Sequence, residues 1–207
     1  MNNEQQLVFG SWIQAIGTTV AAIGATPSKI LSEEQLEGLS VIGNVGQAVG
    51  NALIADTIEE FDLTKAGNEI QSIGNLTVIS GIVIDFDEDT KLNLDISGNL
   101  LQALGGSAAV SETFNEDPSV DVLLAIYGDL LQVIGNSLQA IAGIIESKDR
   151  DSGNINEIGS WIQAIGSILA ALVTSKEVTE NLEENNRNNQ NAFAQPRTTN
   201  RTHFPFF

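Results

Sequence analysis

The chain has 207 residues, of which 27 are acidic and 9 basic, and its formal net charge is -18. Phosphate groups repel so negative a surface, which argues against nucleic acid as a partner and against anionic membrane surfaces. The sequence has no Cys for a disulfide, a zinc ribbon or an iron–sulfur cluster, and its single His203 argues against a histidine metal site or a Ser-His-Asp triad. Hydrophobic residues make up 42% of the chain, which is typical of a folded protein rather than a disordered one.

One eight-residue pattern occurs six times along the chain. It consists of Gly, a small polar residue, any residue, usually an aliphatic residue, Gln, a small residue, an aliphatic residue and Gly. The copies start 33, 24, 31, 30 and 31 residues apart, so each repeat is predicted to be one supersecondary unit. The second copy departs from the pattern at Gly46, where an aliphatic residue is expected. The copies are Gly10–Gly17, Gly43–Gly50, Gly67–Gly74, Gly98–Gly105, Gly128–Gly135 and Gly159–Gly166.

Taken in chain order, six nearly uncharged segments alternate with acidic breaks. The apolar residues within each segment follow a three-four rhythm, as in Ile13, Ile16, Val20 and Ile23, which indicates helix. The β-branched run from Leu76 to Ile84 and the alternating run 91–96 make strand a local alternative, and we expect helix for the former. The breaks fall at 25–29, 59–65, 85–93, 115–119 and 146–154.

These segments predict an all-α fold, an antiparallel bundle or solenoid of six repeated Gly-rich helices of about 20 residues each. The repeat region is predicted to form one domain over residues 1–184, with a disordered tail rich in Asn, Arg and Phe over 185–207.

The repeated glycines need an explanation, because Gly inside a helix costs roughly 1 kcal/mol relative to Ala. Their spacing of seven keeps them on one stripe of each helix, and a stripe without side chains allows two backbones to approach closely. We therefore predict a helix-packing seam. The alternative is that each motif Gly stands at a helix start, with the following polar residue as its cap. The predicted seam comprises Gly10, Gly17, Gly24, Gly43, Gly50, Gly67, Gly74, Gly81, Gly98, Gly105, Gly128, Gly135, Gly159 and Gly166.

Each copy also has a Gln four residues after its first Gly, which places the amide on the glycine stripe. These glutamines either face solvent or lie in the seam, where an amide would bond an opposing carbonyl or another amide and fix the helix register. We include them in the predicted seam: Gln14, Gln47, Gln71, Gln102, Gln132 and Gln163.

Large aromatic residues gather in the first and last copies and at the chain's end. The first and last copies are identical and contain the only two Trp residues, Trp12 and Trp161. Either the two are separate core anchors, or they present like surfaces that close one bundle or pair two molecules. The tail ends in Phe204, Phe206 and Phe207, and with the two Trp residues these are candidate partner-binding residues.

No catalytic constellation is found, so we predict a protein that is not an enzyme and has no cofactor and no specific metal site. Asp85, Asp87 and Asp89 alternate as at the start of a calcium loop, but Thr90 and Ile96 stand where that loop needs Gly and Glu. Diffuse binding of divalent cations across neighbouring acidic breaks stays open.

With their shared form Gly-[Ser/Asn/Asp]-x-[Ile/Leu]-Gln-[Ala/Ser]-[Ile/Leu]-Gly, the copies resemble an uncharacterised family of repetitive proteins of unknown function from Bacillus-type spore-forming bacteria. The likeness covers residues 7–172 and excludes the tail. It implies a bacterial source and brings no established activity with it.

Two classes of function remain. The favoured one is a non-enzymatic structural or self-assembling helical repeat protein, cytoplasmic because no basic leader precedes its first apolar stretch, with a second copy of itself as partner. The alternative is a membrane-associated or membrane-inserting helical protein, since about 18 to 24 apolar residues span a bilayer. Against it, Gln, Asn, Ser and Thr interrupt every segment, and the breaks lack the Lys and Arg enrichment that orients membrane helices.

Overall fold

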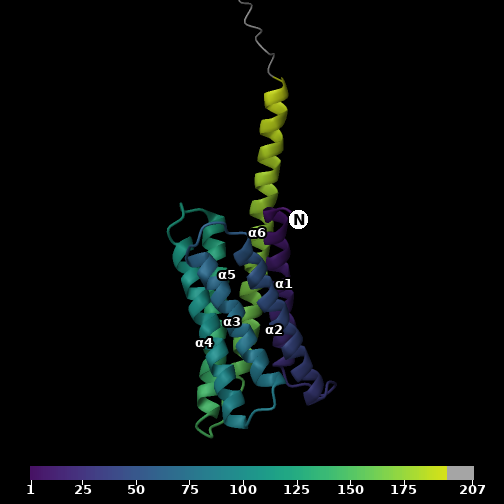
Figure 1. Ribbon diagram of the computed structural model, residues 1–207, viewed down its shortest axis with the longest axis vertical. Coiled ribbons are helices and arrows are strands. Elements are labelled where there is room, and N and C mark those ends of the chain that lie inside the picture. The colour runs from purple at the N-terminus through teal and green to yellow at the C-terminus, as the bar shows by residue number, and fades with distance from the viewer. Residues whose placement is uncertain (195–207) are drawn as a thin grey trace, which may run out of the picture.

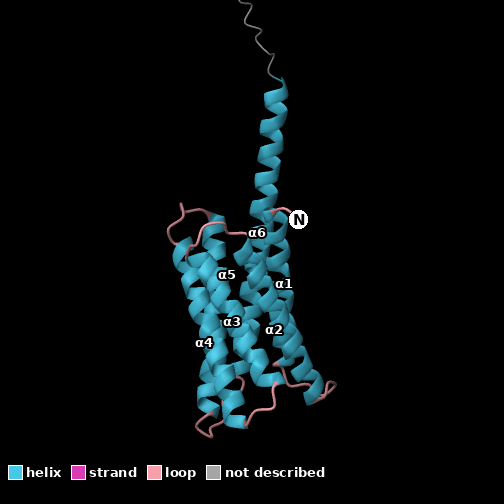
Figure 2. Cartoon of the chain, in the orientation of Figure 1, coloured by secondary structure: helices cyan, strands magenta, loops and turns pink. Residues whose placement is uncertain are grey.

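The computed structural model describes residues 1–194 and places them in six α-helices, with no strand in that part of the chain (Figures 1 and 2). The prediction of an all-α fold is confirmed, and the run from Leu76 is helical as far as Val83. The helices are α1 (Asn3–Gly24), α2 (Glu33–Asp56), α3 (Leu63–Val83), α4 (Glu88–Thr113), α5 (Val120–Glu146) and α6 (Ile155–Ala194).

The first five helices each begin at a short polar side chain that accepts a hydrogen bond from a backbone N–H in the first turn. Asn2 accepts from Gln5 N at 2.8 Å, and Ser32 accepts from Gln35 N at 3.2 Å. The equivalent caps of α3 to α5 are Asp62, Asp87 and Ser119. The motif glycines therefore lie inside helices, and the interpretation that they stand at helix starts is wrong, because each of these caps comes before the first motif Gly of its helix.

The six helices form a closed ring. Each helix contacts the helices before and after it in the chain, and α1 contacts α6, while within the described residues no Cα of one helix comes within 8 Å of a helix across the ring. The architecture is thus a closed antiparallel barrel rather than an open solenoid (Figure 1). The N-terminus lies at the upper end of the view, beside the part of α6 that projects beyond the barrel.

Within the ring, α1 pairs with α2, α3 with α4, and α5 with α6, through glycines on both partners. An ideal Cβ placed on Gly17 would lie 2.7 Å from Gln47 N, and one on Gly98 would lie 2.7 Å from Gly74 O. A Cβ on Gly135 would likewise lie 2.6 Å from Gly159 O. The barrel is therefore three glycine-packed hairpins joined side by side, with backbones so close that a methyl group has no room.

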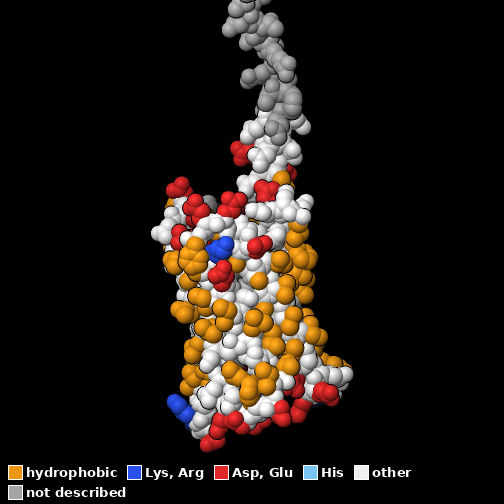
Figure 3. All heavy atoms as spheres, in the orientation of Figure 1, with side chains coloured by type: hydrophobic (Ala, Val, Ile, Leu, Met, Phe, Trp, Pro, Cys, Tyr) orange, Lys and Arg blue, Asp and Glu red, His pale blue; other side chains and the backbone are white. Residues whose placement is uncertain are grey.

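The polarity of the barrel is inverted relative to a water-soluble domain. Ten of the 14 buried hydrophobic residues are Ala, and the largest fully buried side chains are Asn51, Asn75, Asn136, Thr18 and Ser167. Large apolar side chains instead cover the outer surface between the two ends (Figure 3). We call the following residues the apolar belt: Phe9, Ile16, Ile42, Val49, Ile73, Leu76, Leu100, Leu104, Tyr127, Ile134, Ile165 and Leu172, of which each is at least 45% exposed.

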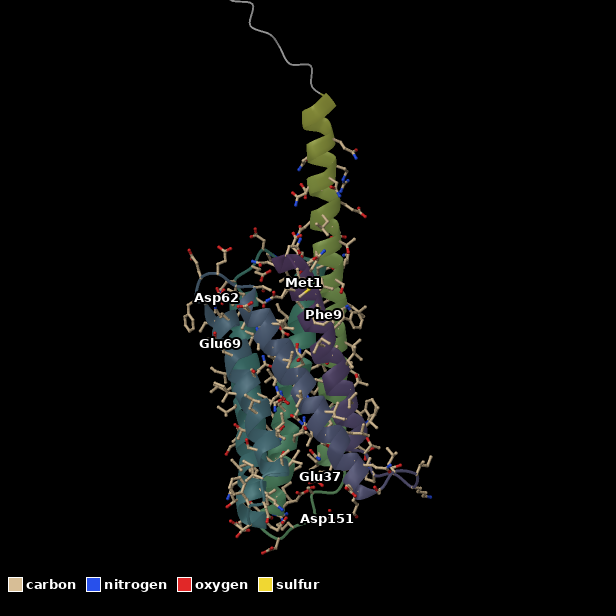
Figure 4. All side chains as sticks on the ribbon, turned by 45° about the vertical axis from the view of Figure 1, so that its right-hand side comes forward. Met1, Phe9, Glu37, Asp62, Glu69 and Asp151 are labelled. Carbon is tan, nitrogen blue, oxygen red and sulfur yellow. The ribbon has the colours of Figure 1, made fainter. Side chains whose placement is uncertain are left out.

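Acidic side chains gather at the two ends of the barrel (Figure 3). Glu37 and Asp151 lie at the lower end of the barrel (Figure 4). Asp62 lies near the upper end, which is also the end that carries Met1 (Figure 4). At the lower end, the hydroxyl and the backbone N–H of Thr90 both donate to Asp87, at 2.8 Å and 2.9 Å. These bonds to the charged carboxylate hold the pKa of Asp87 below its ordinary value of 3.8.

Helix α6 continues to Ala194. It therefore extends past residue 185, where the composition predicts that a disordered tail begins. Residues 185–194 contain no Gly or Pro to stop the helix. Residues 195–207 lie outside the described part of the chain, and with them the candidate partner-binding residues Phe204, Phe206 and Phe207.

Four helices are long and apolar enough to cross a membrane: α1, α2, α5 and α6. With a rise of about 1.5 Å per residue, the 22 residues of α1 span roughly 33 Å, close to the ~30 Å hydrocarbon thickness of a bilayer.

Candidate functional site

The motif glutamines meet inside the ring, where they form two layers. Because the Cα–Cβ bond of a helical residue tilts toward the N-terminus, glutamines on α1, α3 and α5 lean toward the upper end and those on α2, α4 and α6 toward the lower end. All six are at least 93% buried. The upper layer is Gln14, Gln71 and Gln132, and the lower layer is Gln47, Gln102 and Gln163.

Hydrogen bonds join glutamines on helices that stand two apart in the ring, rather than along the glycine seams. In the upper layer, Gln14 Nε2 donates to Gln132 Oε1 at 3.0 Å. In the lower layer, Gln163 Nε2 donates to Gln47 Oε1 at 2.8 Å and to Gln102 Oε1 at 3.3 Å. The glutamines therefore lie beside the glycine stripe, on the side that faces the axis, and bridge helices that have no backbone contact.

Each Gln has a polar or small neighbour one turn away in both directions, on the same face of its helix. Four residues after the Gln stand Thr18, Asn51, Asn75, Gly106, Asn136 and Ser167, and three residues before it stand Ser11, Asn44, Asn68, Asn99, Asp129 and Ser160. The Thr18 and Ser167 hydroxyls are hydrogen-bonded to each other between α1 and α6. A continuous polar face therefore lines the interior of the barrel, which we call the lumen.

Asparagines on this face use their amide nitrogens on their own helices. Asn68 Nδ2 donates to Thr64 O at 2.8 Å, and Asn75 Nδ2 donates to Gln71 O at 2.9 Å. Asn44 and Asn99 make the same bond four residues back. This pattern leaves their side-chain oxygens free of their own helices, and the Oδ1 atoms of Asn51 and Asn75 are buried with no hydrogen-bond partner in the part of the chain that the structure describes.

A cavity lies on each side of the two glutamine layers. The upper cavity has a volume of about 440 Å³ and the lower one about 290 Å³, and residues of all six helices line both. Gln71 and Asn68 belong to the wall of the upper cavity, and Gln102 and Asn99 to that of the lower cavity. The lumen is therefore two polar chambers separated by a narrow hydrogen-bonded centre.

The side chains in the two chamber walls that can carry a full charge are all carboxylic acids. Asp129 lies in the wall of the upper cavity, where Gln132 Nε2 donates to its Oδ1 at 3.4 Å. Asp95 lies in the wall of the lower cavity, where Asn99 Nδ2 donates to its Oδ1 at 3.2 Å. Asp62, Glu112, Glu116 and Glu177 add four more carboxyl groups to the upper chamber, and no Lys or Arg of residues 1–194 lines either one.

The structure places the predicted seam glycines in close contacts between paired helices. A Cβ on Gly43 would lie 2.4 Å from Ala21 N, one on Gly67 2.4 Å from Gly105 O, and one on Gly128 3.0 Å from Gly166 O. Equivalent contacts within the three hairpins are made by Gly10, Gly17, Gly24, Gly50, Gly74, Gly81, Gly98, Gly105, Gly135, Gly159 and Gly166.

The two Trp residues both lie where α1 meets α6. Trp12 Nε1 donates to Ser175 Oγ at 2.9 Å, and Trp161 Nε1 donates to Thr26 Oγ1 at 2.9 Å. The identical first and last copies of the repeat thus come together at the interface that closes the ring. Neither Trp lines the lumen cavities.

Sequence reasoning missed the lumen residues other than the glutamines. The signal was present in the repeat itself, because positions three before and four after each Gln are occupied by Asn, Asp, Ser, Thr or Gly in every copy. It also missed Asp95 and Asp129 as inward-facing charges. Among the described residues, no group of three or more His, Cys, Asp or Glu is arranged to hold a metal ion.

A family model described as a family of unknown function (DUF6944) matches residues 5–171. This range agrees with the resemblance to an uncharacterised repeat family over residues 7–172, while the bacterial source stays a prediction. No curated protein and no solved structure matches the chain.

Proposed function

The chain belongs to the DUF6944 family of unknown function, and from the geometry we propose that it is a non-enzymatic, membrane-inserted barrel with a polar lumen along its axis. The observation that carries this proposal is the inverted polarity: the apolar belt faces outward and the amides face inward. In water this arrangement would expose the large apolar side chains and bury the polar ones, which is unfavourable on both counts.

The apolar belt supports contact with lipid on every side of the barrel. All six helices contribute to it, and Ile16, Leu104 and Ile165 are 56%, 58% and 58% exposed. A soluble monomer rarely exposes a continuous apolar surface of more than a few hundred Å². A hydrocarbon environment, by contrast, solvates such a surface at no cost.

The backbone also suits a bilayer. Helices satisfy their own N–H and C=O groups, which lipid requires, and the glycine seams bring helix pairs together by close packing alone. The polar residues that interrupt every segment argued against membrane spans in the sequence analysis. In the barrel the motif glutamines and their polar neighbours one turn away face the lumen, so these side chains need not contact lipid.

The acidic residues of the breaks lie outside the apolar belt, at the two ends of the barrel (Figure 3). Charged groups at the ends of the helices remain in water on both sides of a bilayer, where they cost little. The distribution of charge along the barrel axis is therefore compatible with insertion.

A soluble, self-assembling protein is the competing function, because further copies of the chain would also cover the belt. Flotation separates the two. The full-length protein, reconstituted with phosphatidylcholine vesicles and washed with alkaline carbonate, is expected to float with the vesicles. Recovery of the washed protein as soluble oligomers would contradict the proposal.

A matched pair of charge substitutions sharpens the test. Ile165 lies in the belt near mid-height, beside the glutamine layers, whereas Ile30 is 92% exposed in the α1–α2 connection. A Lys at the centre of a membrane helix costs roughly 2.5–3.5 kcal/mol, but an exposed apolar-to-charged change in water costs less than about 0.5 kcal/mol. Ile165→Lys should therefore reduce vesicle insertion while Ile30→Lys does not, and equal insertion of the two variants would count against a lipid-facing belt.

A further inference from the structure

Carboxyl groups stand on both sides of the centre of the lumen. Asp129 lies above the glutamine layers and Asp95 below them, and the described residues contribute no Lys or Arg to either chamber. The chambers lead to the two ends of the barrel, where acidic side chains gather (Figure 3). An ion that moves along the axis would thus meet neutral amides, hydroxyls and carboxyl groups, and no cationic side chain of the described residues.

Two asparagines on the glutamine-bearing faces of their helices have buried side-chain oxygens, although neither residue belongs to the wall of either chamber. Asn51 and Asn75 are 1% and 0% exposed, and they stand one turn after a lumen-facing Gln, so they share its face of the helix. The Asn75 amide nitrogen is already bonded to Gln71 O, which directs its Oδ1 away from its own backbone. No donor among the described residues reaches the Oδ1 atoms of Asn51 and Asn75. A buried carbonyl oxygen in this position needs a donor or a cation as its partner.

From these two observations we infer that the lumen is a path for small monovalent cations such as K⁺, an inference that rests on the proposed membrane insertion. The carboxylates raise the cation concentration in each chamber, and the amide oxygens at the centre replace part of the hydration shell of the passing ion. Rings of carboxylates and of carbonyl oxygens are the two devices by which protein pores select cations.

The electrostatic preference follows from Coulomb's law. One ionised carboxylate about 10 Å from an ion, at an effective dielectric constant of about 20, raises the local concentration of a monovalent cation more than about tenfold. It lowers the local concentration of a monovalent anion by the same factor. With one such charge on each side of the centre, K⁺ is expected to pass at least about tenfold faster than Cl⁻.

The glutamine layers form the narrowest part of the path. The bond from Gln14 to Gln132 and the bonds from Gln163 to Gln47 and Gln102 join helices two apart in the ring, so we expect an ion to pass only when these amides rotate. Gln163 also accepts from Gln139 Nε2 at 3.0 Å. We therefore expect a low conductance that rises severalfold in Gln163→Ala.

The test uses the full-length protein in phosphatidylcholine planar bilayers under a KCl gradient, with vesicle flotation of the same preparation. The reversal potential should lie on the K⁺ side in the wild type. The double variant Asp95→Asn/Asp129→Asn should lose most of the preference for K⁺, whereas Glu69→Gln, the same change on the exposed outer face of α3, should keep it (Figure 4). Circular dichroism and flotation establish that each variant is folded and inserted.

The outcomes separate the two proposals. Protein that floats but passes no K⁺, even as Gln163→Ala, or that passes Cl⁻ equally well, overturns the cation path and leaves membrane insertion standing. A preference for K⁺ that persists unchanged in the double variant also overturns it, because the selecting charges would then lie outside the lumen. Protein that does not float overturns both.

Discussion

Two alanine substitutions in α2 test whether the glycine seam requires the absence of a side chain. A Cβ on Gly43 would lie 2.4 Å from Ala21 N and 2.7 Å from Ala21 Cα, whereas a Cβ on Gly38 would have no atom within 4 Å. Both glycines lie inside the same helix, so Gly43→Ala and Gly38→Ala gain the same helix propensity. The difference between the two variants therefore isolates the contact between α1 and α2.

The magnitude follows from the distances. To bring the new methyl group of Gly43→Ala into ordinary contact at 3.4 Å, α1 and α2 must separate by 3.4 minus 2.4, or about 1 Å. Overpacking of this kind costs about 1–3 kcal/mol. Gly38→Ala should stabilise the chain by up to about 1 kcal/mol, because Ala is that much better than Gly inside a helix. The free energy of unfolding of Gly43→Ala should thus lie about 1–3 kcal/mol below that of Gly38→Ala.

Denaturant unfolding of both full-length variants in one detergent, followed by far-ultraviolet circular dichroism, measures this difference. Two variants of equal stability, within about 0.5 kcal/mol, would show that the helices are not in backbone contact at Gly43 and would refute the seam.

Three further predictions address the lumen, the ring closure and a helix cap. Gln163→Leu should keep the helix content but lower the free energy of unfolding by roughly 1–3 kcal/mol for each lower-layer amide oxygen left unpaired, measured in the same denaturant assay. Trp12→Phe removes the hydrogen bond to Ser175 and should lower the free energy of unfolding by about 0.5–1.5 kcal/mol. An unchanged free energy of unfolding would show that this bond does not stabilise the closed ring. Asp87 has a lowered pKa in the folded chain, so its carboxylate adds stability above its ordinary value of 3.8, and this contribution disappears as the pH falls through the lower folded-state value. Asp87→Asn keeps a capping side chain without that titration, so its unfolding free energy should fall less than that of the wild type between pH 5 and 2.

The number and direction of the helices could be predicted from the repeat, because the three-four rhythm and the acidic breaks are local properties of the chain. The close approach at Gly17 and Gly43 followed from the spacing of the glycines together with the cost of Gly in a helix. The ends of the helices followed less well, since α6 continues through a polar segment that composition alone assigned to the tail.

The inward direction of the glutamines could not be predicted in the same way. Gln14 and Ile16 lie on different faces of one uncharged segment, and periodicity does not state which face turns to the interior. In a water-soluble protein Ile16 would be expected inside, because burial of apolar surface away from water is favourable. The barrel instead buries Gln14 and leaves Ile16 56% exposed. Only the closure of α1 against α6, a contact between residues more than 130 apart, fixes which face becomes the lumen.

Spin-label accessibility in phosphatidylcholine vesicles measures whether the apolar belt faces lipid. The chain has no Cys, so Ile165→Cys and Ile30→Cys each carry a single label, one in the apolar belt and one in the α1–α2 connection. We expect the label at 165 to collide with lipid-soluble oxygen and to be shielded from a water-soluble nickel complex. The label at 30 is expected to collide with the nickel complex more than with oxygen. A label at 165 that collides freely with the nickel complex would show that the belt faces water and would contradict the claim.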